Sequence, residues 1–121
     1  MPNKLLVKQN EAYLGGMSWQ GKKLAVLVSA APGQPGFRHG ARVAEAALAA
    51  GVDVYFYCID DAVAGVADPR LEALEPAGLK LFACAESAQR RHLPMNPRAT
   101  QAGLALLANL IAATDRFVAF T

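Results

Sequence analysis

The chain has 121 residues, of which 54% are hydrophobic and 18% are charged, and its formal net charge at pH 7 is +2. That balance excludes intrinsic disorder, and the length is that of one domain whose core is stable without disulfides or metals. The basic residues form no block, which argues against direct nucleic-acid binding, and no apolar run approaches the ~20 residues that span a membrane. The N-terminal apolar run is too short for a signal peptide, so we expect a cytoplasmic protein with free thiols at Cys58 and Cys84.

The first half of the chain predicts two strands joined by a loop and a helix. Residues 24–29 form a continuous apolar run, which is typical of a strand buried on both faces. Residues 30–36 contain two prolines and two glycines and predict a loop. A helix is expected over residues 38–50, ended by Gly51, and an aromatic and β-branched strand over residues 52–59.

Two pairs of a capping residue followed by proline predict helix starts in the second half. Asp68-Pro69 opens a short helix, and Asn96-Pro97 opens the longest helix of the chain, over residues 98–114. The residues expected on the buried stripe of that long helix are Leu104, Leu107, Leu110 and Ile111. The remaining predicted elements are strands over residues 79–84 and 116–121 and a helix over residues 85–92.

Strands that alternate with helices at this spacing predict a parallel sheet with helices on both faces. We therefore expect an α/β fold, a single three-layer α/β/α domain over residues 23–121 with a mostly parallel sheet of about five strands. Residues 1–22 are interpreted as an N-terminal arm or edge segment. Reactive groups in such sheets gather at the carboxyl ends of strands, where both Cys84 and the 30–36 loop are expected. The high apolar fraction also predicts that another subunit covers part of the surface.

Cys84 lies at a predicted corner between a strand and a helix. Free backbone N–H groups and the positive end of the helix dipole favour the thiolate at such a corner. Arg90, Arg91 and His92 follow within about two helical turns, so we expect a partly exposed, electropositive setting, which Glu86 opposes. From these residues alone, a reactive thiol and an inert buried thiol are equally supported.

A second candidate site is the start of the helix that follows the 30–36 loop, where an anion could bind. The segment has neither the Lys-Ser/Thr ending of a P-loop nor a Gly-x-Gly-x-x-Gly fingerprint, and we favour a plain crossover loop. The residues that would form such an anion-binding loop are Gly33, Gly36, Arg38 and His39. Cys58 lies inside a strand and predicts an inert thiol. The two histidines lack metal-ligand spacing, and we expect neither a metal nor a cofactor.

The segment 79–91 resembles the cysteine motif of the DsrE/TusD-type sulfur-relay family (DsrE/DsrF-like), in which a strand ends in a cysteine and a helix with small residues and a basic pair follows. Further segments resemble the same family in the same order, so that the resemblance covers roughly residues 23–121; these are residues 24–36, 44–51, 59–63 and 113–120. Two positions depart from the family pattern, because Ala62 and His92 stand where glycine is usual. We expect His92 to leave the end of its helix less sharply capped and to place an imidazole near the thiol.

The resemblance implies a sulfur carrier. Cys84 would accept sulfane sulfur as a persulfide and pass it to a cysteine of another protein, so the implied partners are sulfur donor and acceptor proteins. Arg90 and Arg91 would stabilise the thiolate or dock a partner, and His92 would donate or accept a proton. Members of the family assemble as homotrimers, homohexamers or heterohexamers, which implies self-assembly or assembly with sister subunits. Two other functions stay open, namely a non-catalytic subunit with a structural or small-ligand-binding role and a thiol redox sensor.

Overall fold

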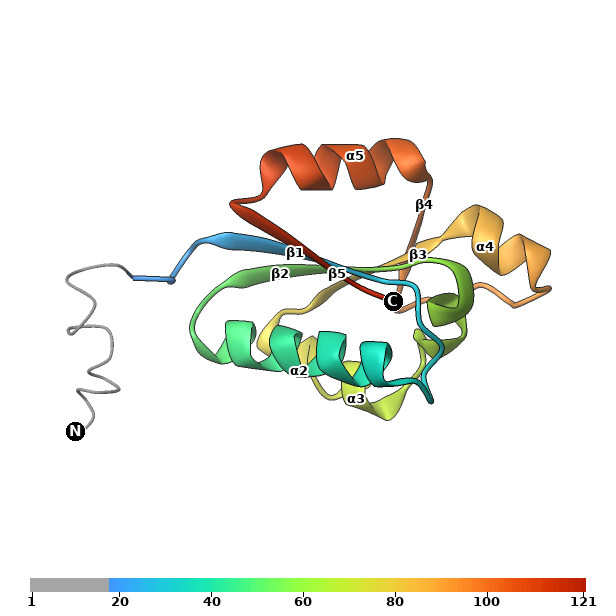
Figure 1. Cartoon of the computed structure of the whole chain (residues 1–121), viewed down its shortest axis with the longest axis horizontal. Helices are drawn as coiled ribbons and strands as arrows, with labels where there is room; N and C mark the ends of the chain where they lie inside the picture. The colour runs from blue at the N-terminus through green and yellow to red at the C-terminus, as the bar shows by residue number, and fades with distance from the viewer. Residues whose placement is uncertain (1–17) are drawn as a thin grey trace.

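The computed structural model describes residues 18–121, in which strands and helices alternate (Figure 1). Most of the predicted N-terminal arm, residues 1–17, lies outside the described residues. The strands are β1 (Lys23–Val28), β2 (Asp53–Cys58), β3 (Lys80–Cys84), β4 (Thr100–Ala102) and β5 (Arg116–Phe120). The helices are α2 (Pro35–Ala49), α3 (Pro69–Glu72), α4 (Ala85–Arg90) and α5 (Leu104–Ala113), with short 3-10 helices η1 (Asp60–Gly65) and η2 (Glu75–Ala77).

The five strands form one sheet in the order β4-β3-β2-β1-β5, and every pair is parallel. Figure 1 shows α2 and α3 on one side of this sheet and α5 on the other. We call these sides the α2 face and the α5 face. The predicted three-layer α/β/α domain with a parallel sheet of about five strands is therefore confirmed.

The α2 face carries a closely packed core. The ring of Phe37 on α2 meets the ring of Phe56 on β2 edge-on, with 6.4 Å between ring centroids. Gly40 brings the helix close to the sheet, because a Cβ at this position would lie 2.6 Å from Cγ2 of Val28. The helix begins at Pro35, so the predicted 30–36 loop is two residues too long, and the predicted stop at Gly51 is confirmed by its positive φ of 84°.

The prediction of one long helix over residues 98–114 is wrong. The Asn96 side chain instead accepts a hydrogen bond from the backbone N–H of Arg98 at 2.8 Å, which closes a local turn. The chain then pairs with β3 as the short edge strand β4, and α5 begins only at Leu104. As a result α5 has 10 residues, and α2, with 15 residues, is the longest helix of the described residues.

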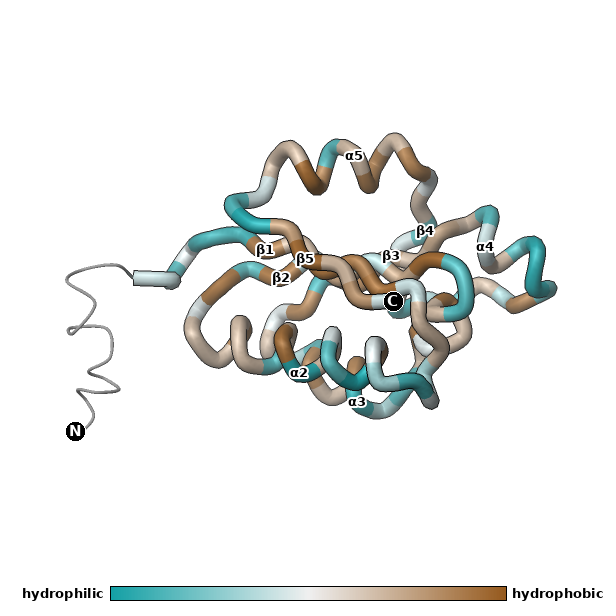
Figure 2. The backbone as a smooth tube through the Cα atoms, in the orientation of Figure 1, coloured by the Kyte–Doolittle hydropathy of each residue, from teal (hydrophilic) through white to brown (hydrophobic). Residues whose placement is uncertain are grey.

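The buried stripe expected on this helix is only half correct. Leu110 is buried and Leu107 is partly buried, whereas Leu104 is 61% exposed and Ile111 is 42% exposed. Phe117, on the edge strand β5, is 38% exposed. Figure 2 shows mostly apolar colours along α5. The described residues therefore leave apolar surface on α5 and β5, although none of their helices is long and apolar enough to cross a membrane.

Candidate functional site

Cys84 is the last residue of β3 and the residue that caps α4, as predicted. In the β3–β4 pairing it lies beside Ala102. Cys84 is only 4% exposed, so the expectation of a partly exposed thiol is wrong for the isolated chain. The reason is the unpredicted strand β4, which pairs with β3 along its end and closes that edge.

The alternation of side chains along the strands determines the face on which Cys84 lies. Cys84 shares a face with Phe82, two residues earlier, and the Phe82 ring stacks on the Tyr57 ring with 6.5 Å between centroids. Phe56, the neighbour of Tyr57, contacts α2, so Tyr57 points the other way. Cys84 therefore lies on the α5 face of the sheet.

Tyr57 is a neighbour of Cys84 that the sequence did not predict. Its hydroxyl donates to the backbone carbonyl of Gly103 at 3.0 Å and lies 3.4 Å from that of Ala102. Burial, the charge of Cys84 and a hydrogen bond to Cys84 together raise the pKa of Tyr57 to about 12. The phenol therefore stays protonated at neutral pH, with its one O–H proton on the Gly103 carbonyl and its oxygen next to the sulfur. A polar side chain near the end of the neighbouring predicted strand was the signal that could have identified it.

The two arginines after Cys84 are engaged with carboxylates. Arg90 pairs with Glu86 one turn earlier, at 2.9 Å, and both side chains are exposed. Arg91 binds Asp61 through Nη2 at 2.9 Å and Nε at 3.2 Å. Within residues 18–121 no hydrogen bond joins either guanidinium to Cys84. The expected direct stabilisation of the thiolate by Arg90 and Arg91 is therefore not supported by a hydrogen bond between these residues and Cys84.

These contacts hold α4 in place against η1, the turn that follows β2. The Ser87 hydroxyl, buried on α4, accepts a hydrogen bond from the backbone N–H of Asp60 at 3.0 Å. Arg91 adds its pair with Asp61 and also donates to the carbonyl of Ser87 at 3.2 Å. The ends of β2 and β3 are thereby tied together, which fixes the direction in which α4 leaves Cys84.

His92 adopts the left-handed conformation that usually favours glycine, with φ of 54°. Its N–H donates to the carbonyl of Gln89, and the N–H of Leu93 donates to that of Ala88, which is the Schellman pattern. His92 therefore forms the complete set of cap hydrogen bonds, at the cost of a strained backbone. The six residues of α4, which rise about 9 Å, and Arg91 separate His92 from Cys84, and the His92 side chain is exposed.

The four residues predicted for an anion-binding loop lie in different surroundings. Gly33 is exposed, and Gly36 lies within α2, where a Cβ would overlap the carbonyl oxygen of Thr121. His39 is exposed, while Arg38 lines a cleft between α2 and α3. Among residues 18–121, no group of three or more His, Cys, Asp and Glu side chains could hold a metal ion.

Comparison with known proteins gives one family and one fold. The model of the DsrE/DsrF-like family matches residues 22–120. Five chains of solved structures are similar to this one, among them the YchN protein from E. coli. That similarity covers 84% of this chain and 100% of the YchN chain, with a TM-score of 0.72 and 20% sequence identity, and it shows the fold alone. No curated protein matches this chain.

Proposed function

This chain belongs to the DsrE/DsrF-like family, and on that premise we propose that it carries sulfane sulfur as a persulfide on Cys84 and passes it to a cysteine of a partner protein. The observation that carries the proposal is the position of the thiol. Cys84 ends a parallel strand at the start of α4, where ligands and reactive groups collect in such sheets, and a protonated Tyr57 hydroxyl lies beside it.

The proposed reaction is thiol–persulfide exchange. The Cys84 thiolate attacks the outer sulfur of a donor persulfide, and a new S–S bond forms to Cys84. The donor's own S–S bond breaks, its electron pair stays on the donor sulfur, and that sulfur takes up a proton. No external oxidant or reductant is needed, because the sulfane sulfur only changes its carrier. Release to an acceptor cysteine is the same step in the opposite direction.

Access to the sulfur defines what a partner protein must do. Cys84 is 4% exposed, and β4, the strand next to it, has three residues and pairs only with β3 in the described sheet. Such a short edge strand is a low-stability element. We therefore propose that donor and acceptor proteins open this edge when they dock, and that they do so through Arg90, Arg91 and His92. The Arg90–Glu86 pair is exposed and so costs little to break.

The proposal extends to assembly and location. The exposed apolar residues of α5 and β5 support a homo-oligomer, a trimer or hexamer, or an assembly with sister subunits. A persulfide carrier needs a compartment that keeps thiols reduced, and both cysteines of this chain are free, which supports the cytoplasm. We assign the activity to the domain of residues 23–121 and treat residues 1–22 as an appended arm.

The test uses the two cysteines as a matched pair. The protein is incubated with a sulfane-sulfur donor, and its intact mass is measured for wild type, Cys84→Ala and Cys58→Ala. We expect wild type and Cys58→Ala to gain the mass of sulfur, the gain to disappear with reductant, and Cys84→Ala to gain nothing. An unmodified wild type, with its Cys84 thiol shown to be free by alkylation after unfolding, would contradict the proposal.

The 4% exposure of Cys84 favours one alternative, a non-catalytic subunit with a structural or small-ligand-binding role. That alternative predicts assembly without any sulfur adduct. A redox sensor that uses Cys58 as its resolving thiol is not supported. Cys58 is fully buried on the α2 face, and burial raises the pKa of its thiol to about 12. Cys84 lies on the opposite face.

A further inference from the structure

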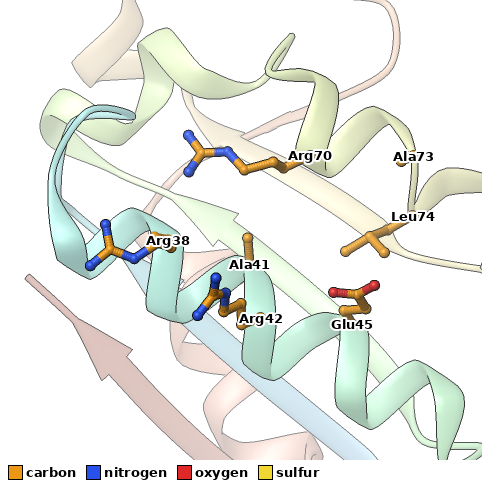
Figure 3. Close-up of a pocket in the computed structure, with 7 residues that line it drawn as sticks. All are labelled: Arg38, Ala41, Arg42, Glu45, Arg70, Ala73 and Leu74. Carbon is orange, nitrogen blue, oxygen red and sulfur yellow. The ribbon is translucent and has the colours of Figure 1, made fainter.

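The cleft between α2 and α3 lies on the other side of the sheet from Cys84. It has a volume of about 400 Å³ and opens between α2 and the segment that begins with α3. Figure 3 shows the side chains that line it. They are Arg38, Ala41, Arg42 and Glu45 from α2 and Arg70, Ala73 and Leu74 from the facing segment.

The cleft is polar at one end and apolar along its floor. The α2 residues occur at helical spacing and therefore share one face of that helix. Figure 3 shows the guanidinium groups of Arg38, Arg42 and Arg70 toward one end of the cleft, with Glu45 and Leu74 toward the other. Ala41 is buried beneath them. The three cations come from positions up to 32 residues apart in sequence, so only the fold brings them together.

Arg70 is held in a fixed orientation. Its Nε and Nη2 donate to the two carboxylate oxygens of Asp68 at 2.9 Å, and Nη2 also donates to the carbonyl of Pro32 at 2.8 Å. The guanidinium lies over the Phe37 ring, 5.0 Å from its centroid. Within residues 18–121 no hydrogen bond uses its Nη1, so the two N–H donors of that atom are available to a ligand.

The other two arginines have no carboxylate partner among residues 18–121. The five ion pairs found there involve neither Arg38 nor Arg42. These two side chains stand at i and i+4 on α2, where like charges destabilise a helix. An anion between them would remove that repulsion.

We propose that this cleft binds a small oxyanion that carries at least two negative charges, a phosphate or phosphoryl group, on Arg38, Arg42 and Arg70. Guanidinium groups bind such oxyanions through charge-assisted N–H donors, and Arg70, whose Nε and Nη2 are engaged by Asp68, offers the two donors of its Nη1 in a fixed orientation. Glu45 at the other end repels a second anionic group, so the rest of the ligand is neutral or cationic and lies along Ala41 and Leu74. The site does not depend on the sulfur chemistry proposed for Cys84.

The test is a titration with inorganic phosphate at constant ionic strength, followed by calorimetry and by the NMR signals of the arginine Nε–H groups. We expect saturable binding with one phosphate per chain. The double variant Arg38→Gln/Arg42→Gln should weaken it at least tenfold, because two charge-assisted contacts are lost. Arg90→Gln removes an exposed arginine far along the chain from the cleft and serves as the matched control. It should bind as wild type does.

Several outcomes separate this site from a general attraction of anions and from the sulfur proposal. Arg70→Lys keeps the charge but loses the two Nη1 donors, and we expect weaker binding of phosphate than in wild type. Cys84→Ala should bind phosphate normally. Non-saturable binding, or an equal loss in Arg90→Gln and in the double variant, would overturn the proposal. The double variant changes only exposed side chains, so its folding is checked by far-UV circular dichroism.

Discussion

The two faces of the sheet differ in how completely the chain itself covers them. On the α2 face, Phe37, Phe56 and Leu71 are at most 1% exposed. On the side of α5 and the edge strand β5, Leu104 and Phe117 remain exposed. The α2 face is thus a fully buried core, which we call the finished core and which determines stability. The α5 face leaves apolar surface that another molecule can cover. The candidate site lies on this second, less completed side.

The two cysteines lie on opposite faces of the sheet and so show the same difference between the faces. Cys58 pairs with Ala83 in the β2–β3 ladder, so Cys84 lies one residue further along than the partner of Cys58. Because side chains alternate, an offset of one residue moves a thiol to the opposite face of the sheet. Cys58 therefore points into the finished core, and Cys84 points toward Tyr57 and the edge strand β4.

The largest effect that we expect from this difference is in thiol alkylation. At pH 8 a thiol with a pKa of about 12, such as Cys58, is about one part in ten thousand thiolate, so it should react about a thousandfold slower than an ordinary cysteine. Mass mapping after iodoacetamide treatment should find Cys84 labelled first in the folded protein. Both thiols should be labelled at similar rates in denaturant. Labelling of folded Cys58 as fast as Cys84 would remove the distinction.

The next largest effect is on the free energy of unfolding, when leucine is replaced by alanine once on each side of the sheet. Leu71→Ala removes a side chain that is 1% exposed, and we expect a loss of about 2–5 kcal/mol in the free energy of unfolding. Leu104→Ala removes one that is 61% exposed, and the loss should be below about 0.5 kcal/mol in the monomer. Urea denaturation at low protein concentration measures both. A larger cost of Leu104→Ala that appears only at high concentration would show that a second copy covers α5.

The sequence predicted the apolar strands better than the short strand β4. Apolar runs predicted β1, β2, β3 and β5 to within a residue or two, because buried parallel strands need no other signal. β4 was missed because Thr100–Ala102 has no apolar run and becomes a strand only by pairing with β3. The same element buries Cys84, which explains why the predicted exposure of the thiol was also wrong.

The candidate sites were predictable only as far as they are local in sequence. The corner at Cys84 follows from one strand and one helix, and it was predicted. Tyr57 is linked to that corner through Gly103, 46 residues away, and Arg38 and Arg70 line one cleft between α2 and the segment that begins with α3. Such contacts depend on strand order and helix packing. Neither the strand order nor the helix packing can be predicted from a single sequence.

Tyr57→Phe tests whether the neighbour of Cys84 matters to its chemistry. The hydroxyl lies beside the sulfur and can turn its one proton from the Gly103 carbonyl toward a thiolate or persulfide sulfur, so its removal should slow alkylation and sulfur uptake at Cys84 about tenfold at neutral pH. Alkylation of Cys58 should not change. We also expect a loss of about 1 kcal/mol in stability, because the carbonyl of Gly103 loses its partner. Equal rates at Cys84 in both proteins would leave Tyr57 a purely structural residue.

The smallest effect concerns His92, whose φ of 54° strains any residue that has a Cβ. His92→Gly should raise the free energy of unfolding by about 1 kcal/mol, since glycine adopts this conformation without steric cost. His92→Ala is the matched control, because it removes the imidazole but keeps the strain, and it should not stabilise the protein. With a small sulfane-sulfur donor we expect both variants to load Cys84 as fast as wild type, because α4 separates the imidazole from the sulfur. Slower loading in both variants would assign the imidazole a direct part in proton transfer. The reactive region around Cys84 would then include His92, at the far end of α4.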